Sequence, residues 1–166
     1  MNAPSFADTL AQADALFLEV KCSARLVMLA PLRRLVGAVA EELGFAGEDL
    51  IKIEMAVDEA CTNAFLHGRS GDPGDDEPEK ESKVGLKMSA SPQCLTIEVS
   101  NRDSGQVAPW RGAVTMADYA LLGRDDYKGL GTLIMRQFMD EARVATAEGR
   151  TRVTLRKRLP SRPDGA

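Results

Sequence analysis

The sequence contains few of the residues that build metal centres or disulfide frameworks. Among its 166 residues are three cysteines, Cys22, Cys61 and Cys94, with no C-x-x-C spacing, and a single histidine, His67. An odd and scattered set of cysteines is typical of reduced thiols, so we expect a cytoplasmic protein without disulfides. One histidine also disfavours a zinc site made from Cys and His ligands.

Long apolar runs and an excess of positive charge are absent as well. No run of about 18 apolar residues is present, so no membrane-spanning helix is predicted, and the start of the chain does not resemble a signal peptide. The net charge of −4 and the pI near 5.1 disfavour nucleic-acid binding. The length and the apolar fraction of 44% are those of one folded domain, which we expect to span residues 1–166.

The spacing of apolar residues divides the chain into strands and helices. Short apolar or alternating segments predict strands, whereas apolar residues at every third or fourth position predict helices. The predicted elements, in chain order, are a strand at 15–22, helices at 25–45 and 47–68, strands at 83–90 and 94–101, a helix at 129–142, and strands at 143–148 and 151–159. This order predicts an α+β fold, a two-layer sandwich of a mixed, largely antiparallel sheet with helices on one face.

Single residues and loop composition add detail between these elements. Ser23 is expected to cap the first helix, in which Pro31 either introduces a kink or marks a delayed start. Residues 69–83 are rich in glycine, proline and acidic residues, which predicts a solvated loop. Residues 102–128 show no clear period, and an irregular segment of this length is typical of a functional lid.

Two polar side chains interrupt the apolar helix predicted at 47–68. Glu59 and Asn63 are four residues apart, so they lie one turn apart on the same helix face. A carboxylate there can act as a general base, and a carboxamide oxygen suits Mg²⁺, which takes few protein ligands beside phosphate and water oxygens. Taken alone, a solvated pair at the edge of an amphipathic face also accounts for the pattern. His67 continues the same line and is interpreted as a helix-end residue.

The segment KGLGTLIMRQFMDE places a lysine and two glycines before a helix. Gly129 and Gly131 let the backbone approach a ligand closely, and the helix behind them directs its free N–H groups and positive dipole end at that place, as in many phosphate sites. Lys128 adds positive charge. An ordinary glycine-rich loop is the alternative.

The segment VSNRDSG places Asn101, Asp103 and Gly105 where a predicted strand ends. An acid at a strand end beside a glycine can accept a hydrogen bond from the exocyclic amine of a nucleotide base. Ordinary turn chemistry is again the alternative.

Taken together, the order, spacing and flanking strands of these segments resemble the GHKL ATPase family, and within it the serine-kinase anti-sigma factors of bacterial partner-switching systems. DEACTNAFLHG is similar to that family's N box, and GLGTLIMRQFMDE is similar to its glycine-rich G2 box throughout the helix. The ending EGRTRVTLRKRL also fits. The resemblance covers roughly residues 15–159 and implies the Bergerat-type ATP-binding fold.

The resemblance also implies an activity, a site and partners. It implies an ATP- and Mg²⁺-dependent protein serine kinase that phosphorylates a small anti-sigma-factor antagonist, with a sigma factor as a further possible partner and a homodimer as the assembly. By the resemblance Glu59 is the base that activates the target serine and Asn63 ligates Mg²⁺. The nucleotide-binding residues that it implies are Asn63, Asn101, Asp103, Gly105, Lys128, Gly129, Gly131 and Thr132.

The G1 box departs from the family pattern D-x-G-x-G, in which the Asp contacts the adenine amino group. In one register Asp103 takes the acid position and Gly105 the first glycine, but Val107 replaces the second glycine. In the other, Asn101 takes the acid position and Asp103 and Gly105 take the glycine positions. Residues 101 and 103 point the same way along a strand, so alternation does not separate the two registers.

The second register exchanges a charged acceptor for a neutral one. A hydrogen bond to a charged group contributes about 1.5–3 kcal/mol against about 1 kcal/mol for a neutral one, so ATP affinity would fall by about tenfold. The sequence therefore leaves an alternative open, a partner-binding module of the same fold with weak or no kinase activity. A detached ATPase domain of a sensor histidine kinase is disfavoured, because the chain enters through a strand without an upstream phosphoacceptor helix pair.

Overall fold

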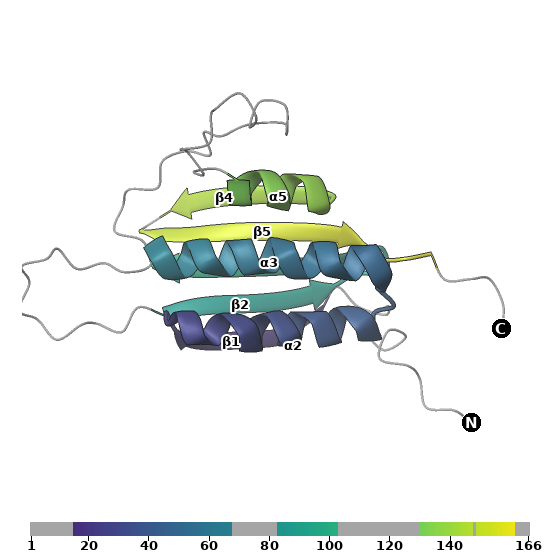
Figure 1. Ribbon diagram of the computed structural model, residues 1–166, viewed down its shortest axis with the longest axis horizontal. Helices are drawn as coiled ribbons and strands as arrows, with labels where there is room; N and C mark the ends of the chain where they lie inside the picture. The colour runs from purple at the N-terminus through teal and green to yellow at the C-terminus, as the bar shows by residue number, and fades with distance from the viewer. Residues whose placement is uncertain (1–14, 68–82, 103–129, 148, 162–166) are drawn as a thin grey trace, which may run out of the picture.

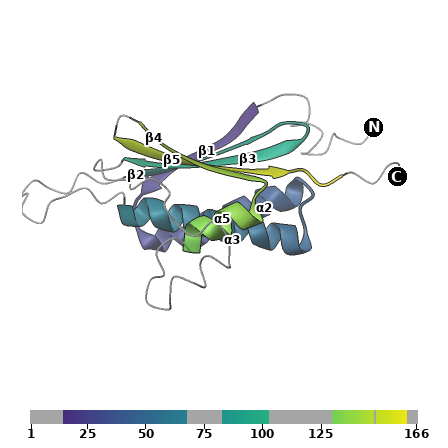
Figure 2. The same cartoon turned by 90° about the horizontal axis from the view of Figure 1, so that it is seen from above.

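The computed structural model describes residues 15–67, 83–102, 130–147 and 149–161 of the chain. They form one five-stranded sheet with helices on one of its faces, as Figure 1 and Figure 2 show from two directions. The strands are β1 (Ala15–Ser23), β2 (Lys83–Ala90), β3 (Cys94–Arg102), β4 (Glu141–Ala147) and β5 (Arg150–Arg158); the helices are the 3₁₀ turn η1 (Leu26–Met28), α2 (Leu29–Glu42), α3 (Gly47–His67) and α5 (Leu130–Phe138). The predicted two-layer α+β fold is confirmed.

The strands lie in the order β1-β2-β3-β5-β4, and every pairing among them is antiparallel. The predicted sheet was largely antiparallel with some parallel pairing, and the described strands show none of the latter. Two of the neighbouring pairs, β2–β3 and β4–β5, are hairpins, whereas α2 and α3 lie between β1 and β2 in the chain. In the β2–β3 turn the Ser91 N–H donates to the Cys94 carbonyl at 2.9 Å, and in the β4–β5 turn Gly149 takes φ +67°, a conformation that favours glycine.

Alternation along the strands places the core on the face that the helices cover. Successive strand residues point to opposite faces, and in β2 and β3 every second residue is buried. The buried apolar side chains of the three central strands are Val84, Leu86, Met88, Ala90, Leu95, Ile97, Val99, Val153 and Leu155. They pack against apolar residues of α2, α3 and α5 and against Met139 just after α5, so the sheet and the helices share one core.

The first helix begins later than its apolar pattern predicts. Ser23 is the last residue of β1 and caps no helix, since no side chain caps η1 or α2 and only the Ser23 backbone carbonyl is used, accepting from the Arg25 N–H at 2.8 Å. The expected Ser23 cap is therefore wrong. Pro31 marks a delayed start: it is the third residue of α2, where backbone N–H groups have no partner within the helix, so its missing N–H costs no helical hydrogen bond.

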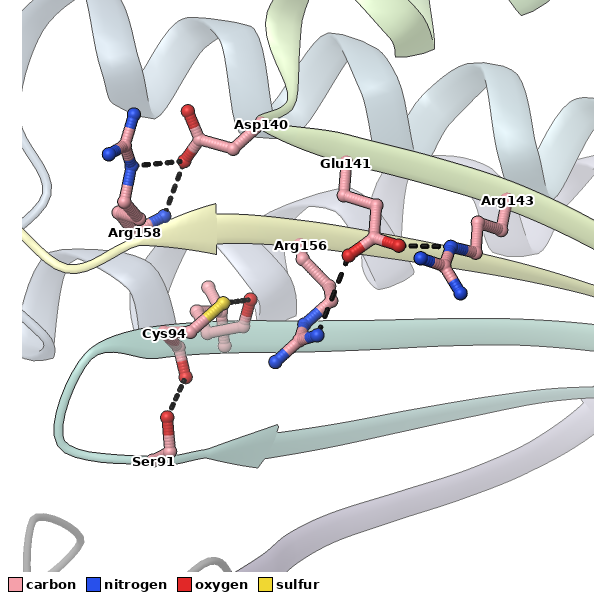
Figure 3. Close-up of polar contacts among 8 residues, drawn as sticks. Ser91, Cys94, Asp140, Glu141, Arg143, Arg156 and Arg158 are labelled. Atoms are coloured by element: carbon pink, nitrogen blue, oxygen red, sulfur yellow. Dashed lines mark hydrogen bonds and ion pairs between the residues drawn. The ribbon is translucent and has the colours of Figure 1, made fainter.

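The last helix is shorter than predicted and ends at Phe138, not at residue 142. Two residues of β5 hold this end. Lys157 donates through Nζ to the Phe138 carbonyl at 3.0 Å, and the Asp140 carboxylate accepts the Arg158 backbone N–H at 2.6 Å. Figure 3 shows Asp140 turned toward Arg158, with Glu141 already in β4 and paired with Arg143 and Arg156. Helix periodicity continues through this segment, but tertiary contacts end the helix.

None of the helices in the described ranges is long and apolar enough to cross a membrane.

Candidate functional site

Helix α3 is the central helix of its layer, with α2 on one flank and α5 on the other (Figure 1). Its buried face, which includes Ile53, Val57 and Ala60, packs toward the sheet. Glu59 and Asn63 are half-buried instead. The two polar residues therefore lie beside the core and not within it, on the flank of α3 that α5 covers.

The first turn of α5 contacts this flank at Gly131. A Cβ added to Gly131 would overlap the Glu59 Oε2 atom and would lie 3.6 Å from Asn63 Nδ2. The structure thus brings together three residues that the sequence predicted for the site, from the N-box and G2-box segments. Thr132 is the next residue of the same turn and is half-buried.

The carboxyl group of Glu59 has a raised pKa. Burial is the larger cause, because it penalises the charged form, and the neighbouring Asp58 carboxylate adds to it. No cation forms an ion pair with Glu59 within the described part of the chain. A partly desolvated carboxylate without a counter-charge is a good proton acceptor, and such groups concentrate at functional sites.

Asn101 lies at the end of β3 and is only 6% exposed. Its Nδ2 donates to the backbone carbonyl of Ala64 at 3.2 Å, so the end of β3 is tied to α3 next to Asn63. This places Asn101 beside the other predicted residues. Asp103, Gly105, Lys128 and Gly129 lie outside the described residues, and so do residues 103–128 of the segment predicted as a lid. The register of the G1 box therefore stays open.

Two contributors to the site were not singled out from the sequence. Asp58 raises the pKa of Glu59 and also approaches Arg33 of α2, with 3.9 Å between Oδ1 and Nη1. The Ala64 carbonyl is a backbone group and has no sequence signal. For Asp58, the only hint in the sequence is that it comes directly before Glu59. Its approach to Arg33 depends on how α2 packs on α3.

The fold and this arrangement define a class of protein: an α+β domain whose central helix presents a carboxylate and a carboxamide to the glycine that opens a neighbouring helix. A match to the histidine kinase-like ATPase domain extends over residues 22–157, and the chain belongs to that family. The family resemblance predicted from the N-box and G2-box segments is thereby confirmed.

The chain is similar to bacterial proteins named as serine-protein kinases and anti-sigma factors. The chain is 27% identical over 142 residues to the serine-protein kinase RsbW of Bacillus pumilus, with 81% of each chain covered. It is 30% identical over 127 residues to the anti-sigma F factor of Clostridium novyi, covering 76% of this chain and 82% of the relative. A crystal structure of the RsbU and RsbW domains of a Mycobacterium tuberculosis protein matches with a TM-score of 0.60 at 21% identity, over 88% of this chain and 33% of that longer one, which supports the fold.

The contact between Asn101 and Ala64 predicts a stability effect. Asn101→Asp removes the only N–H donor of this side chain and places a carboxylate oxygen beside a carbonyl oxygen in a buried position. We expect the free energy of unfolding at neutral pH to fall by about 1–3 kcal/mol, the usual cost of an unsatisfied buried polar group. Urea unfolding of both proteins measures it, and an unchanged midpoint and slope would contradict the contact.

Proposed function

We propose that the protein is an ATP- and Mg²⁺-dependent protein serine kinase and anti-sigma factor that phosphorylates an anti-sigma-factor antagonist. The observation that carries the proposal is the meeting of Glu59, Asn63 and Gly131, because it joins a desolvated carboxylate, a metal-binding type of side chain and a helix N-terminus in one place. The names of the relatives, a serine-protein kinase and an anti-sigma factor, support the same activity.

Each residue has a role in this proposal. The backbone at Gly131 and Thr132 receives nucleotide phosphates at the start of α5, where free N–H groups and the positive dipole end favour anions. Glu59 accepts the proton of the target serine hydroxyl. The serine oxygen then forms a bond to the γ-phosphorus of ATP, and ADP leaves. Lys128 and Gly129 extend the phosphate site, and Asn101 or Asp103 with Gly105 contacts the adenine.

Asn63 is proposed as the protein ligand of Mg²⁺. Within the described ranges no group of three or more His, Cys, Asp or Glu residues gathers into a metal site. A single carboxamide suits Mg²⁺, which completes its shell with phosphate and water oxygens. When bound, the ion would neutralise negative charge on the nucleotide phosphates.

The partners and the setting are proposals too. The antagonist is the serine substrate, a sigma factor is a second possible partner, and the protein acts as a cytoplasmic homodimer of single domains without nucleic acid or membrane contact. The rival function is a partner-binding module of the same fold without kinase activity, which the altered G1 box favours.

Incubation with γ-labelled ATP, Mg²⁺ and candidate antagonist proteins from the same genome tests the proposal. Label on a serine of one candidate supports the kinase. Partner binding without label on any candidate supports the binding module instead.

The metal assignment predicts that Asn63→Ala weakens the dependence of ATP binding on Mg²⁺. The variant lacks the only protein oxygen proposed as a direct ligand, so added Mg²⁺ should raise ATP affinity less than it does in the wild type. Calorimetric titrations with ATP at several Mg²⁺ concentrations measure this. Asn63→Asp is the matched control, since it keeps an oxygen at the same place, and identical Mg²⁺ curves for Asn63→Ala and wild type would refute the assignment.

A further inference from the structure

Helix α3 places two of its carboxylates against glycines of the two flanking helices. On one flank Glu54 lies over Gly37 of α2, where an added Cβ would overlap Glu54 Oε1 and lie 3.3 Å from its Cδ. On the other flank Glu59 lies over Gly131 of α5, where an added Cβ would overlap Glu59 Oε2 and lie 3.2 Å from its Cδ. The two contacts have the same geometry, but only the second belongs to the proposed site.

We propose that Gly131 is a positioning residue for Glu59: the space left by its missing Cβ is where the Glu59 carboxylate rests. The inference deepens the proposed function, because it gives residue 131 a second task beside phosphate contact and makes the direction of the Glu59 side chain depend on α5.

The Glu59 side chain is free to move away from residue 131. Glu59 can rotate about several bonds, and the outward side of α3 next to it is open, since Met55, one turn earlier, is 43% exposed. A methyl group at residue 131 would meet the flexible end of Glu59 and not the backbone, so the carboxylate would turn toward solvent while the helices stay in place. Residue 131 therefore acts on the base with little effect on the fold.

The burial of Glu59 gives this inference a readout that needs no catalysis. The raised pKa of Glu59 has burial as its first cause. If the carboxylate leaves its place against Gly131, it gains solvent and its pKa moves back toward the ordinary value. Carbon-13 NMR of the labelled Glu side chains, followed as the pH is changed, measures this pKa in wild type and in Gly131→Ala.

Gly37→Ala is the matched control. It makes the same substitution within a helix and displaces the equivalent carboxylate, that of Glu54, from α2. We expect Gly131→Ala to lower the pKa of Glu59 and Gly37→Ala to leave it unchanged. An unchanged Glu59 pKa in Gly131→Ala, with the variant folded, would overturn the inference.

Kinetics provide the second readout. Misplacement of a reacting group by about 1 Å costs about 10²-fold in rate, so Gly131→Ala should lower kcat, measured at saturating ATP, by that order. Loss of ATP binding with an unchanged Glu59 pKa would show that Gly131 serves only backbone approach to the phosphates, against the inference.

A second variant covers the possibility that Gly131→Ala does not fold. The Glu59→Ala variant lacks the carboxylate, so adding Gly131→Ala to it should not impair folding. If this double variant also fails to fold, the inference is wrong. If the wild-type protein shows no phosphoryl transfer to any antagonist, the proposed function is wrong. The NMR comparison would still decide where the Glu59 carboxylate lies.

Discussion

Glu59→Gln is expected to lose most phosphoryl transfer, by about 10²–10⁴-fold, the usual contribution of a general base. Glutamine keeps the shape of the side chain and can still form hydrogen bonds, but it cannot take the proton of the target serine. ATP affinity and partner affinity should change little, because neither depends on that proton. Single-turnover phosphorylation of the antagonist, measured beside calorimetric ATP binding, tests the two halves of this expectation.

The matched control is Glu54→Gln. Glu54 lies on the same helix and against a glycine in the same way, but it faces α2. Its loss should leave the transfer rate unchanged. Equal rates for wild type and Glu59→Gln, both clearly above background, would remove Glu59 from the mechanism.

Unfolding does not offer another explanation for the loss, and the sign of the pH effect shows why. The pKa of Glu59 is raised in the folded protein by burial and by Asp58. A carboxyl of this kind contributes stability that is fully present below its ordinary pKa of 4.5 and is lost as the pH rises through the raised value. Glutamine has no charge to desolvate, so at neutral pH the variant should be at least as stable as the wild type.

The second large effect is expected in the core under the site. Phe65 is 2% exposed and lies on α3 two residues after Asn63. Phe65→Ala should lower the free energy of unfolding by about 3–5 kcal/mol, since it removes a buried ring and leaves a cavity. Domains of ordinary stability unfold at about 5–15 kcal/mol, so this loss is a large share of the total.

The neighbouring residue supplies the control for this prediction. Leu66 is 56% exposed on the same turn of α3, and surface substitutions usually change stability by about 0.5 kcal/mol or less. Urea unfolding should therefore separate Phe65→Ala clearly from Leu66→Ala. Similar costs for both would mean that this turn of α3 does not pack as described.

The fold was predictable because the spacing of apolar residues in most elements indicates both the type of element and the face that it buries. Every second residue of β2 and β3 is buried, and all of these residues except Asn101 are apolar. The start of α3 at Gly47 also agrees with the sequence. The end of α5 was not predictable in this way. Its helical pattern continues through Asp140, and the contacts that end the helix come from Lys157 and Arg158, far along the chain.

The candidate site was predictable to the extent that its residues are close in sequence. The four-residue spacing of Glu59 and Asn63 placed both on one face of α3. That Gly131 lies against them, and that Asn101 donates to Ala64, depends on packing between elements that are far apart along the chain. The spacing of the G1 box allows two registers, because alternate residues of a strand face the same way.

NMR of the nitrogen-15-labelled protein during titration with Mg²⁺–ATP shows directly whether the nucleotide lies between α3 and the first turn of α5. We expect the largest shifts at the backbone amides of Gly131 and Thr132 and at the side-chain amide of Asn63, with little change on the open face of the sheet, for example at Thr96. Binding of Mg²⁺–ATP with unchanged signals from Gly131, Thr132 and Asn63 would contradict this position of the nucleotide.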